Sequence, residues 1–510
     1  MNTAEKLNSN GVLLDLINGL VSLPDPAPQS VNIVATGIQM DSRLLQKGDL
    51  FLACFGNNHD AREYIDEAIE IGVAAVLAES GGEWQGVRLI KDVAVIAIDN
   101  LSAKLGEIAA RFYSHPSRRL SVIGITGTNG KTSCSQFIAQ ALADTGFSCG
   151  TMGTLGYGIY GELKETQLTT PDPVFTQMAL AEMAQSGIDP VVMEVSSVGL
   201  HQRRVKAVKF DTAIFTNLTR DHLDYHESME AYGNNKKKLF TSEGLSRAIV
   251  NLDDPYALSI INAIAPSVDV YTYSLKNSAA TVYAESLSLT RQGFEARLVT
   301  PIGAGTVKGK LFGYFNVSNL LAVITTLINY LPKKKVLDIA QLCELVSGLS
   351  SVDGRMEIIG DFEEITAVVD YAHTPDGLRS ALKGLRDHFS GNIWCVFGCG
   401  GNRDKGKRPI MGEVAEAFAD RLIITDDNPR NEKGDDIVQH ILSGMNKPEQ
   451  AVIERDREKA IAYAIANAES GDVVVVAGKG HETYQDVGGS RLIFSDASQV
   501  RLALQAREKK

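Results

Sequence analysis

The sequence predicts an α/β protein built of three domains, and two observations support this fold class. Short runs rich in Val and Ile alternate with longer amphipathic stretches almost throughout the chain. The 510 residues also exceed what one hydrophobic core usually organises, because domains average about 150 residues. Alternating strand and helix patterns build parallel sheets covered by helices, so we expect this architecture to recur along the chain.

Nine apolar runs are predicted to be strands. They are rich in Val and Ile and have Gly, Asp, Asn or Ser at or next to their last residue, which is typical of a buried parallel strand followed by a functional turn. They are 73–80, 93–99, 120–127, 190–197, 212–218, 248–254, 393–401, 421–429 and 472–480. Amphipathic periodicity predicts helices between them, for example over 132–146, 175–187 and 408–420.

Two changes in composition suggest where the domains meet. A first α/β block closes near Asp99–Asn100, and the small polar residues of 348–354 mark a second break. A segment richer in strands and turns lies between them, from about Val270 to Gly313. We therefore predict domains over 1–99, 100–351 and 352–510, of which the N-terminal α/β domain is the smallest.

Charge and composition exclude several functional classes. The net charge is -12, whereas nucleic-acid-binding proteins normally present a basic face, so we expect small-molecule partners and no nucleic acid. Six cysteines are scattered, and no second Cys/His pair at zinc-ligand spacing accompanies Cys395 and Cys399, as expected of a reduced intracellular protein. The first residues lack signal-peptide features, and no apolar run approaches about 18 residues. We expect a cytoplasmic protein without membrane insertion.

The strongest local signal is GITGTNGKT, from Gly124 to Thr132, between a predicted strand and a predicted helix. Glycines let the backbone wrap a phosphate, and the helix N-terminus favours its negative charge. Lys131 can reach the β- and γ-phosphates, and Thr132 can ligate Mg²⁺. Ile125 stands where the usual spacing has glycine, so this is a variant P-loop. The alternative is an ordinary strand–helix turn, but the flanking elements favour nucleotide binding.

A carboxylate and an imidazole follow two other predicted strands. Glu194 and His222 are expected at the carboxyl edge of the sheet, where α/β proteins bind ligands, and they suit a divalent cation beside a nucleotide. Taken singly, Glu194 could instead cap a turn and His222 lie on the surface. Composition alone assigns the lysine run 236–238 to a solvated helix face.

Four charged turns follow strands in the last third, at 371–377, 399–409, 425–432 and 477–482. Arg403 and Arg430 can clamp a carboxylate with two hydrogen bonds, while Asp427, Asn428 and Glu482 can receive an ammonium group. Together they suit a zwitterionic amino acid. Short motifs such as D-N-P and G-G-N are also common in ordinary turns, so the competing interpretation is that these segments are turns without a ligand.

The order and spacing of these motifs resemble the Mur ligases. The resemblance runs from about Met40 to Glu482 and rests on TGTNGKT, MEVSS, TNLTRDHLDYH, NLDD, GYFNVSN, VDGRME, VVDYAHTPDGL, GCGGNRDKGKRP, TDDNPR and AGKGHE. It implies an N-terminal domain for the UDP end of a substrate, a central P-loop ATPase with a parallel sheet, and a C-terminal Rossmann-like domain for an amino acid. The implied reaction joins that amino acid to the D-glutamate γ-carboxylate of a UDP-linked muramoyl dipeptide through an acyl phosphate.

By the same resemblance, ATP and Mg²⁺ are the cofactors. The implied ATP contacts are Gly127, Thr128, Asn129, Gly130, Lys131, Thr132, Asn316, Asn319, Arg355 and Asp370. The implied metal ligands are Thr132, Glu194, His222 and Lys236, the last as a carbamylated lysine whose charge has become negative. The resemblance thus makes Lys131, Glu194, His222 and Lys236 the catalytic residues.

The resemblance also implies two substrate sites. Contacts to the UDP-muramoyl dipeptide fall on Met40, Ser42, Asn57, Asn58, His59, Thr169, Thr170, Ser196, Gln202 and Arg204. Val198 stands where many relatives have histidine, and Leu168 stands where some relatives have asparagine. The implied amino-acid contacts are Arg403, Asp427, Asn428, Pro429, Arg430, Gly478 and Glu482.

The TDDNPR motif points to meso-diaminopimelate, because lysine-adding relatives usually lack its arginine. Arg430 can pair with the distal carboxylate that diaminopimelate has and lysine lacks. Ligases adding lysine or D-alanyl-D-alanine, and folylpolyglutamate synthetases, are the near alternatives. A non-catalytic nucleotide-binding protein is the alternative from another class. We expect a monomer.

Overall fold

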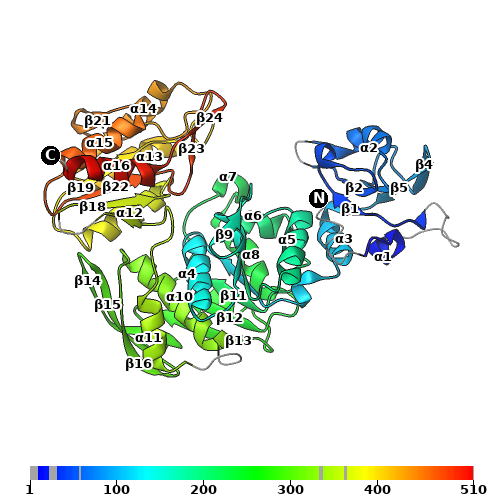
Figure 1. Ribbon diagram of the computed structural model, residues 1–510, viewed down its shortest axis with the longest axis horizontal. Coiled ribbons are helices and arrows are strands. Elements are labelled where there is room, and N and C mark those ends of the chain that lie inside the picture. The colour runs from blue at the N-terminus through cyan, green and yellow to red at the C-terminus, as the bar shows by residue number, and fades with distance from the viewer. Residues whose placement is uncertain (1–9, 22–30, 57–58, 332–336, 361–363, 509–510) are drawn as a thin grey trace.

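The computed structural model describes residues 10–21, 31–56, 59–331, 337–360 and 364–508. Its main sheets fall in three consecutive parts of the chain, and each lies within one of the predicted ranges 1–99, 100–351 and 352–510. The N-terminal unit, blue in Figure 1, and the C-terminal unit, yellow to red, lie at opposite ends of the molecule. Both border the central unit.

The N-terminal unit is built on a five-stranded sheet in the order β1-β2-β3-β5-β4, parallel except for β4. Helix α3 packs against this sheet through Leu105 and Ile108, and the same apolar cluster includes Val174 from helix α5 (Pro173–Gln185) of the central unit. The elements are α1 (Leu13–Ile17), β1 (Gly37–Gln39), η3 (Ser42–Leu44), β2 (Asp49–Ala53), η4 (Ala61–Tyr64), α2 (Ile65–Ile71), β3 (Ala75–Glu79), β4 (Val87–Ile90), β5 (Val93–Ile98), η5 (Leu101–Ala103) and α3 (Leu105–Phe112).

The central unit holds an eleven-stranded sheet in the order β16-β15-β14-β13-β12-β11-β6-β10-β7-β8-β9. Its middle strands are parallel, and antiparallel strands extend it at both edges. The elements are η6 (Pro116–Arg118), β6 (Val122–Thr126), α4 (Lys131–Asp144), β7 (Gly150–Gly153), β8 (Gly156–Ile159), β9 (Glu162–Lys164), α5 (Pro173–Gln185), β10 (Val191–Glu194), α6 (Ser197–His201), β11 (Thr212–Phe215), α7 (Leu223–His226), α8 (Met229–Lys237), η7 (Lys238–Thr241), β12 (Arg247–Asn251), α9 (Ala257–Ile261), β13 (Asp269–Ser274), β14 (Val282–Thr290), β15 (Gly293–Thr300), β16 (Gly303–Gly309), α10 (Tyr314–Tyr330) and α11 (Ile339–Ser347).

The C-terminal unit holds a six-stranded sheet in the order β17-β18-β22-β19-β20-β21, parallel except for β17. A separate hairpin, β23–β24, follows it. The elements are β17 (Glu357–Ile359), β18 (Thr366–Asp370), α12 (Pro375–Arg386), β19 (Ile393–Phe397), α13 (Lys407–Phe418), β20 (Arg421–Ile424), α14 (Gly434–Leu442), η9 (Pro448–Gln450), β21 (Val452–Ile453), α15 (Arg457–Asn467), β22 (Val473–Ala477), β23 (Tyr484–Val487), β24 (Ser490–Ile493) and α16 (Asp496–Glu508).

Strand β22 shows why continuous apolar runs form these sheets. Val473 and Val475 pack into the cluster on one face of the sheet, and Val474 and Val476 pack into the cluster on the other. Side chains alternate between faces, so a strand buried on both faces must be apolar at every position. The functional residues therefore gather where such strands end.

The structure confirms the predicted elements. All nine apolar runs contain a strand, and the predicted helices correspond to α4, α5 and α13. The strand-rich segment becomes β13 to β16. No helix in the described part of the chain is both long and apolar enough to cross a membrane.

Candidate active site

The predicted phosphate-binding loop, residues 127–130, joins the end of β6 to the start of α4. Gly130 has φ of +85°, and a Cβ there would lie 2.4 Å from Oδ1 of Asn319 on α10. A Cβ on Gly127 would lie 1.8 Å from Oγ1 of Thr216, just after β11. The loop therefore requires glycine at both positions, because neighbouring elements leave no room for a side chain.

The chain after β11 fixes the loop by hydrogen bonds. The Asn129 N–H donates to Oδ1 of Asn217 at 2.9 Å, and the Asn129 carbonyl accepts from Oγ1 of Thr216 at 2.6 Å. The Thr128 hydroxyl accepts from the Thr219 N–H at 3.0 Å. Residues 216–219 thus hold the loop in shape, a contribution that was not predicted from the sequence.

Lys131 lies over this loop. Its Nζ donates to the carbonyls of Gly127 and Thr128, each at 2.8 Å. Burial lowers the pKa of the Lys131 ammonium, and the charge of Glu194 acts in the opposite direction. A cation held against the loop backbone is placed to meet a bound phosphate.

Glu194, the last residue of β10, is only 1% exposed and faces the loop. Its carboxylate accepts from Oγ1 of Thr132 at 2.9 Å, and from the backbone N–H and Oγ1 of Thr154 at 2.8 and 3.2 Å. Thr154 was not predicted, because its partner lies 40 residues away and nothing in the local sequence indicates the contact. A carboxylate and a hydroxyl therefore stand side by side beside the loop.

These oxygen donors fit Mg²⁺, which takes one or two protein ligands together with waters and substrate phosphates. No group of three or more His, Cys, Asp or Glu side chains in the described ranges can hold a metal ion by itself. The pair formed by Thr132 and Glu194 is therefore the part of the predicted set that the structure brings together.

Lys236 and His222 have contrasting environments. Lys236, near the end of α8, is 1% exposed, and its Nζ lies 4.3 Å from the centre of the Tyr232 ring. No salt bridge involves Lys236 in the part of the chain that the structure describes. Burial and then Lys131 lower the pKa of its ammonium well below the usual value. The His222 side chain is 52% exposed and lies 3.6 Å from Asp221.

The four predicted nucleotide contacts beyond the loop lie on both sides of the junction with the C-terminal unit. Asn316 and Asn319 are buried in the first turns of α10, and the Asn319 amide lies 3.4 Å from Oδ1 of Asn316. Arg355 reaches Oγ1 of Thr132 at 3.4 Å. The Asp370 carboxylate accepts from the backbone N–H groups of Met356 and Ala372, and burial raises its pKa.

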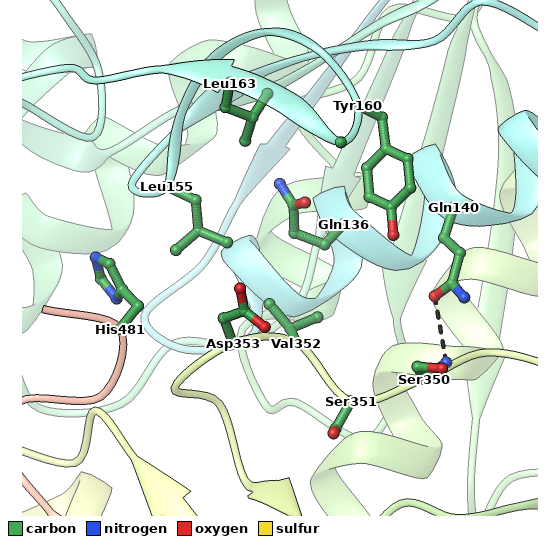
Figure 2. A pocket seen from close by; sticks show the side chains of 11 residues that line it. Gln136, Gln140, Leu155, Tyr160, Leu163, Ser350, Ser351, Val352, Asp353 and His481 are labelled. Carbon is green, nitrogen blue, oxygen red and sulfur yellow. Dashed lines mark hydrogen bonds between the residues drawn. The ribbon is translucent and has the colours of Figure 1, made fainter. Parts of the chain in front are cut away.

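A pocket of about 380 Å³ opens next to the loop helix, between the β8–β9 hairpin and residues 350–353 (Figure 2). Gln136, one turn beyond Thr132, and His481 from the C-terminal unit point toward it. Burial, Arg355 and Lys479 lower the pKa of His481 to about 4, so its imidazole is neutral at pH 7. The pocket marks where the C-terminal unit meets the nucleotide side of the site.

The predicted muramoyl-dipeptide contacts of the central unit form one network that starts at Glu194. Oγ1 of Thr170 donates to the Glu194 carbonyl at 3.0 Å and accepts from the Ser196 N–H at 2.9 Å. Arg204 donates to the Thr170 carbonyl at 2.7 Å and to Oε1 of Gln202 at 2.9 and 2.6 Å. Thr169 joins the same network through Thr154, 3.1 Å away.

Val198 and Leu168, the two residues that differ from many relatives, lie close in sequence to members of this network. Val198 is half-buried on α6, and Leu168 is 47% exposed. In the N-terminal unit, Met40 packs partly against the core, and Ser42 begins η3. His59 is exposed, and its carbonyl accepts from the Gly56 N–H at 2.9 Å. The predicted contacts Asn57 and Asn58 lie outside the described residues.

The predicted amino-acid contacts meet at the carboxyl edge of the C-terminal sheet. A Cβ on Gly400 would lie 2.9 Å from Nη1 of Arg430 and 3.5 Å from Cγ of Arg403, so the two arginines flank this glycine. Arg430 also donates to the Gly401 carbonyl at 2.8 Å. Its N–H binds the Asp486 carbonyl at 2.9 Å, on β23.

Acidic groups lie close to this arginine pair. A Cβ on Gly478 would lie 2.6 Å from Oδ2 of Asp427, which places that carboxylate against the turn after β22. The Asn428 amide donates to Oε2 of Glu482 at 2.8 Å, and Pro429 lies next in the chain. The edge thus presents cationic and anionic groups a few residues apart.

The fold and site define a class of protein: a three-part α/β enzyme with a phosphate-binding loop beside a buried carboxylate, and an acidic and basic edge on a separate sheet. Family models match in the same order. They are "Mur ligase family, catalytic domain" over 34–113, "Mur ligase middle domain" over 125–327 and "Mur ligase, glutamate ligase domain" over 354–480. The chain belongs to the Mur ligase family.

Individual relatives are similar over nearly the whole chain. The UDP-N-acetylmuramoyl-L-alanyl-D-glutamate–2,6-diaminopimelate ligase of Coxiella burnetii is 45% identical over 480 residues, covering 93% of this chain and 96% of that protein. The ligase of the same name from Pseudomonas aeruginosa is also 45% identical, covering 96% and 99%. A solved structure bearing this ligase name is 33% identical, with a TM-score of 0.70 and coverage of 98% and 99%.

Proposed function

We propose that this chain adds meso-2,6-diaminopimelate to UDP-N-acetylmuramoyl-L-alanyl-D-glutamate, with ATP converted to ADP and phosphate. The supporting observation is that Glu194 hydrogen-bonds both Thr132, in the first turn of α4 directly after the phosphate-binding loop, and Thr170 of the muramoyl-dipeptide network. One residue thus links the predicted γ-phosphate position to the predicted position of the acceptor carboxylate. The names of the relatives supply the substrates. We further propose that the enzyme acts as a cytoplasmic monomer.

The reaction begins with activation of the D-glutamate γ-carboxylate. A carboxylate oxygen attacks the γ-phosphorus of ATP, ADP leaves, and an acyl phosphate forms. The first turn of α4, which starts at Lys131, offers its backbone N–H groups to the phosphates, and the Lys131 ammonium offsets their negative charge. Thr132 and Glu194 would hold Mg²⁺, which when bound neutralises phosphate charge. The loop, held by Asn217, fixes the geometry before substrate arrives.

The second step forms the amide. The amine of diaminopimelate attacks the acyl carbonyl, loses a proton, and expels inorganic phosphate. Arg403 and Arg430 are proposed to bind a carboxylate of the amino acid, while Asp427 and Glu482 receive an ammonium group. Because these groups belong to the C-terminal unit, the reaction requires that unit to deliver the amine to the loop.

Lys236 is proposed to act as a carbamate. Its amine is buried on the Tyr232 ring, and the charge of Lys131 at the start of α4 makes a second cation there unfavourable. Addition of CO₂ to the neutral amine releases a proton and gives an anion. That anion would complete the metal set of Thr132, Glu194 and His222.

A ligation assay with two amino acids tests this function. With ATP, Mg²⁺ and the UDP-muramoyl dipeptide, ADP release should depend on meso-diaminopimelate and not on L-lysine. Arg430→Ala should lower kcat/KM for diaminopimelate about 100-fold, since truncating one partner of a charge pair typically costs about 2–5 kcal/mol. Arg421→Ala, an exposed arginine at the opposite end of the same sheet, is the matched control.

Each outcome has a separate meaning. Turnover with lysine in place of diaminopimelate would keep the ligase activity and remove the role of Arg430. If neither diaminopimelate nor lysine supports ADP release, the enzyme would be a ligase that adds a different amino acid or peptide. ATP binding without any substrate-dependent hydrolysis would favour a non-catalytic member of the family.

A further inference from the structure

Lys479, in the turn after β22, is a charged residue that the predicted site does not include. Its side chain is 0% exposed, although the turn lies at the edge where the amino acid is proposed to bind. Its Nζ donates to Oε2 of Glu482 at 2.8 Å and to Oδ1 of Asn428 at 3.0 Å. It also lies 5.6 Å from the centre of the Tyr484 ring. Both hydrogen-bond acceptors are predicted amino-acid contacts.

The burial of Lys479 makes this arrangement specific. An ammonium removed from water is stable only when it is paired and hydrogen-bonded, and Glu482 is its single salt-bridge partner in the described ranges. Removing either partner would leave a buried charge. The Lys479–Glu482 pair therefore fixes the Glu482 side chain in one position.

The two carboxylate oxygens of Glu482 differ in their hydrogen bonding. Oε2 accepts from both Lys479 and the Asn428 amide, which lies 2.8 Å away. Oε1 accepts no hydrogen bond from the described residues. The Asn428 oxygen is already occupied, because Oδ1 accepts from Lys479 and from the Asp486 N–H at 2.9 Å. Of the side-chain oxygens of Glu482 and Asn428 that the structure describes, Oε1 of Glu482 is therefore the one left to receive a donor.

We infer that Lys479 is a positioning residue for the amino-acid substrate, acting through Glu482. Together with Asn428, it holds Oε2 so that Oε1 faces an ammonium group of the incoming amino acid. Asn428 then contributes to binding by orienting Glu482. This inference rests on the proposed function of the same site.

Lys479→Met removes the charge and its donors while keeping an unbranched side chain. We expect KM for meso-diaminopimelate to rise about tenfold or more, the effect of losing a hydrogen bond to a charged group. KM for ATP and for the UDP-muramoyl dipeptide should stay within about twofold, because the hydrogen bonds of Lys479 go to Glu482 and Asn428, which are predicted contacts of the amino acid alone. Lys459→Met changes an exposed lysine on α15 and serves as the control.

A double-mutant cycle separates positioning from general stability. In a Glu482→Gln background, Lys479→Met should add little to the increase in KM for diaminopimelate, because both changes act on the same carboxylate. If Lys479→Met does not fold, Asn428→Leu removes the other bond to Oε2, together with the Lys479–Asn428 bond, and keeps both members of the Lys479–Glu482 ion pair. It should raise the same KM by a smaller factor.

Three results would overturn the inference: equal losses for all three substrates, additive effects of Lys479→Met and Glu482→Gln, or an unchanged KM for diaminopimelate in Lys479→Met. Wild-type enzyme that turns over diaminopimelate while Lys479→Met retains its KM would reject only the positioning role. Wild-type enzyme without diaminopimelate-dependent ADP release would instead reject the proposed function.

Discussion

The phosphate-binding loop and the amino-acid edge solve the same problem, holding a charged ligand, in different ways. The loop is contiguous, and its shape depends on Gly127 and Gly130, which adjacent elements leave no room to replace. The amino-acid edge joins side chains from three turns, and buried pairs such as Lys479–Glu482 hold them in place. The first site is set mainly by backbone and the second mainly by side chains. Substitutions in the two sites should therefore change different kinetic constants.

The substitution with the largest expected effect is at Lys236. It tests whether the phosphate-binding site also depends on a buried side chain. Lys236→Ala should lower kcat about 100- to 1000-fold, the cost of losing one group that stabilises transition-state charge. High bicarbonate should not restore this activity. Wild-type enzyme depleted of CO₂ should lose activity and regain it with bicarbonate, and labelled bicarbonate should give a carbamate signal at neutral pH.

The neighbouring lysine provides the control for this experiment. Lys237 on the same helix is only partly buried and lies 5.4 Å from the centre of the Tyr256 ring, so Lys237→Ala should keep near-normal activity. Full activity of wild-type enzyme without CO₂, together with an unmodified Lys236 by mass, would reject the carbamate.

Intermediate effects are expected from one substitution made in each region. Gly130→Ala places a Cβ 2.4 Å from Asn319 at φ of +85°, and we expect about tenfold lower kcat/KM for ATP with little change in KM for diaminopimelate. Gly478→Ala places a Cβ 2.6 Å from Asp427 at φ of +116°, and we expect the opposite pattern.

A third glycine isolates backbone strain. Gly146 has φ of +92°, but a Cβ added there would meet nothing within 4 Å, so Gly146→Ala should lower stability by about 1 kcal/mol and leave both KM values unchanged. Thermal unfolding and steady-state kinetics of the three variants check these patterns. If Gly130→Ala and Gly478→Ala raised the same KM, the two regions would not act separately.

The sequence predicted much of the fold for a physical reason. Strands buried on both faces need apolar residues throughout, as in Val473–Val476, and this pattern is visible without coordinates. The strands β7 and β8 were not predicted, because GTMG and GYGI have little of the β-branched signal. Their pairing depends on the rest of the sheet.

The same distinction applies to the site. Gly130 and Lys131 could be assigned from a contiguous motif, since strand, loop and helix follow one another. Thr154 could not be assigned, because it meets Glu194 only through the fold. Lys479 lay within a recognised motif, yet its burial and its bond to Glu482 depend on how separate turns pack. Sequence thus names candidate residues more readily than it reveals their partners.

The smallest effect is expected from removing one atom, the hydroxyl oxygen of Tyr232, which hydrogen-bonds the phosphate-binding loop. Burial raises the pKa of Tyr232, so its hydroxyl stays protonated, and it donates to Oγ1 of Thr128 at 3.1 Å. Tyr232→Phe removes this bond but keeps the ring beneath Lys236, and Thr128 keeps its bonds to Thr219. We expect kcat/KM for ATP to fall only about two- to fivefold, since a neutral hydrogen bond contributes about 1 kcal/mol.

Tyr232→Leu completes this test because it removes the ring as well as the hydroxyl. If the ring determines the environment of Lys236, the leucine variant should lose far more activity than the phenylalanine variant and should show less carbamate. Equal losses would mean that the hydroxyl bond to Thr128 carries the whole effect. In that case Tyr232 acts only on the phosphate-binding loop. The ring of Tyr232 would then not determine the environment of Lys236, and the geometry of the phosphate site would depend mainly on backbone contacts.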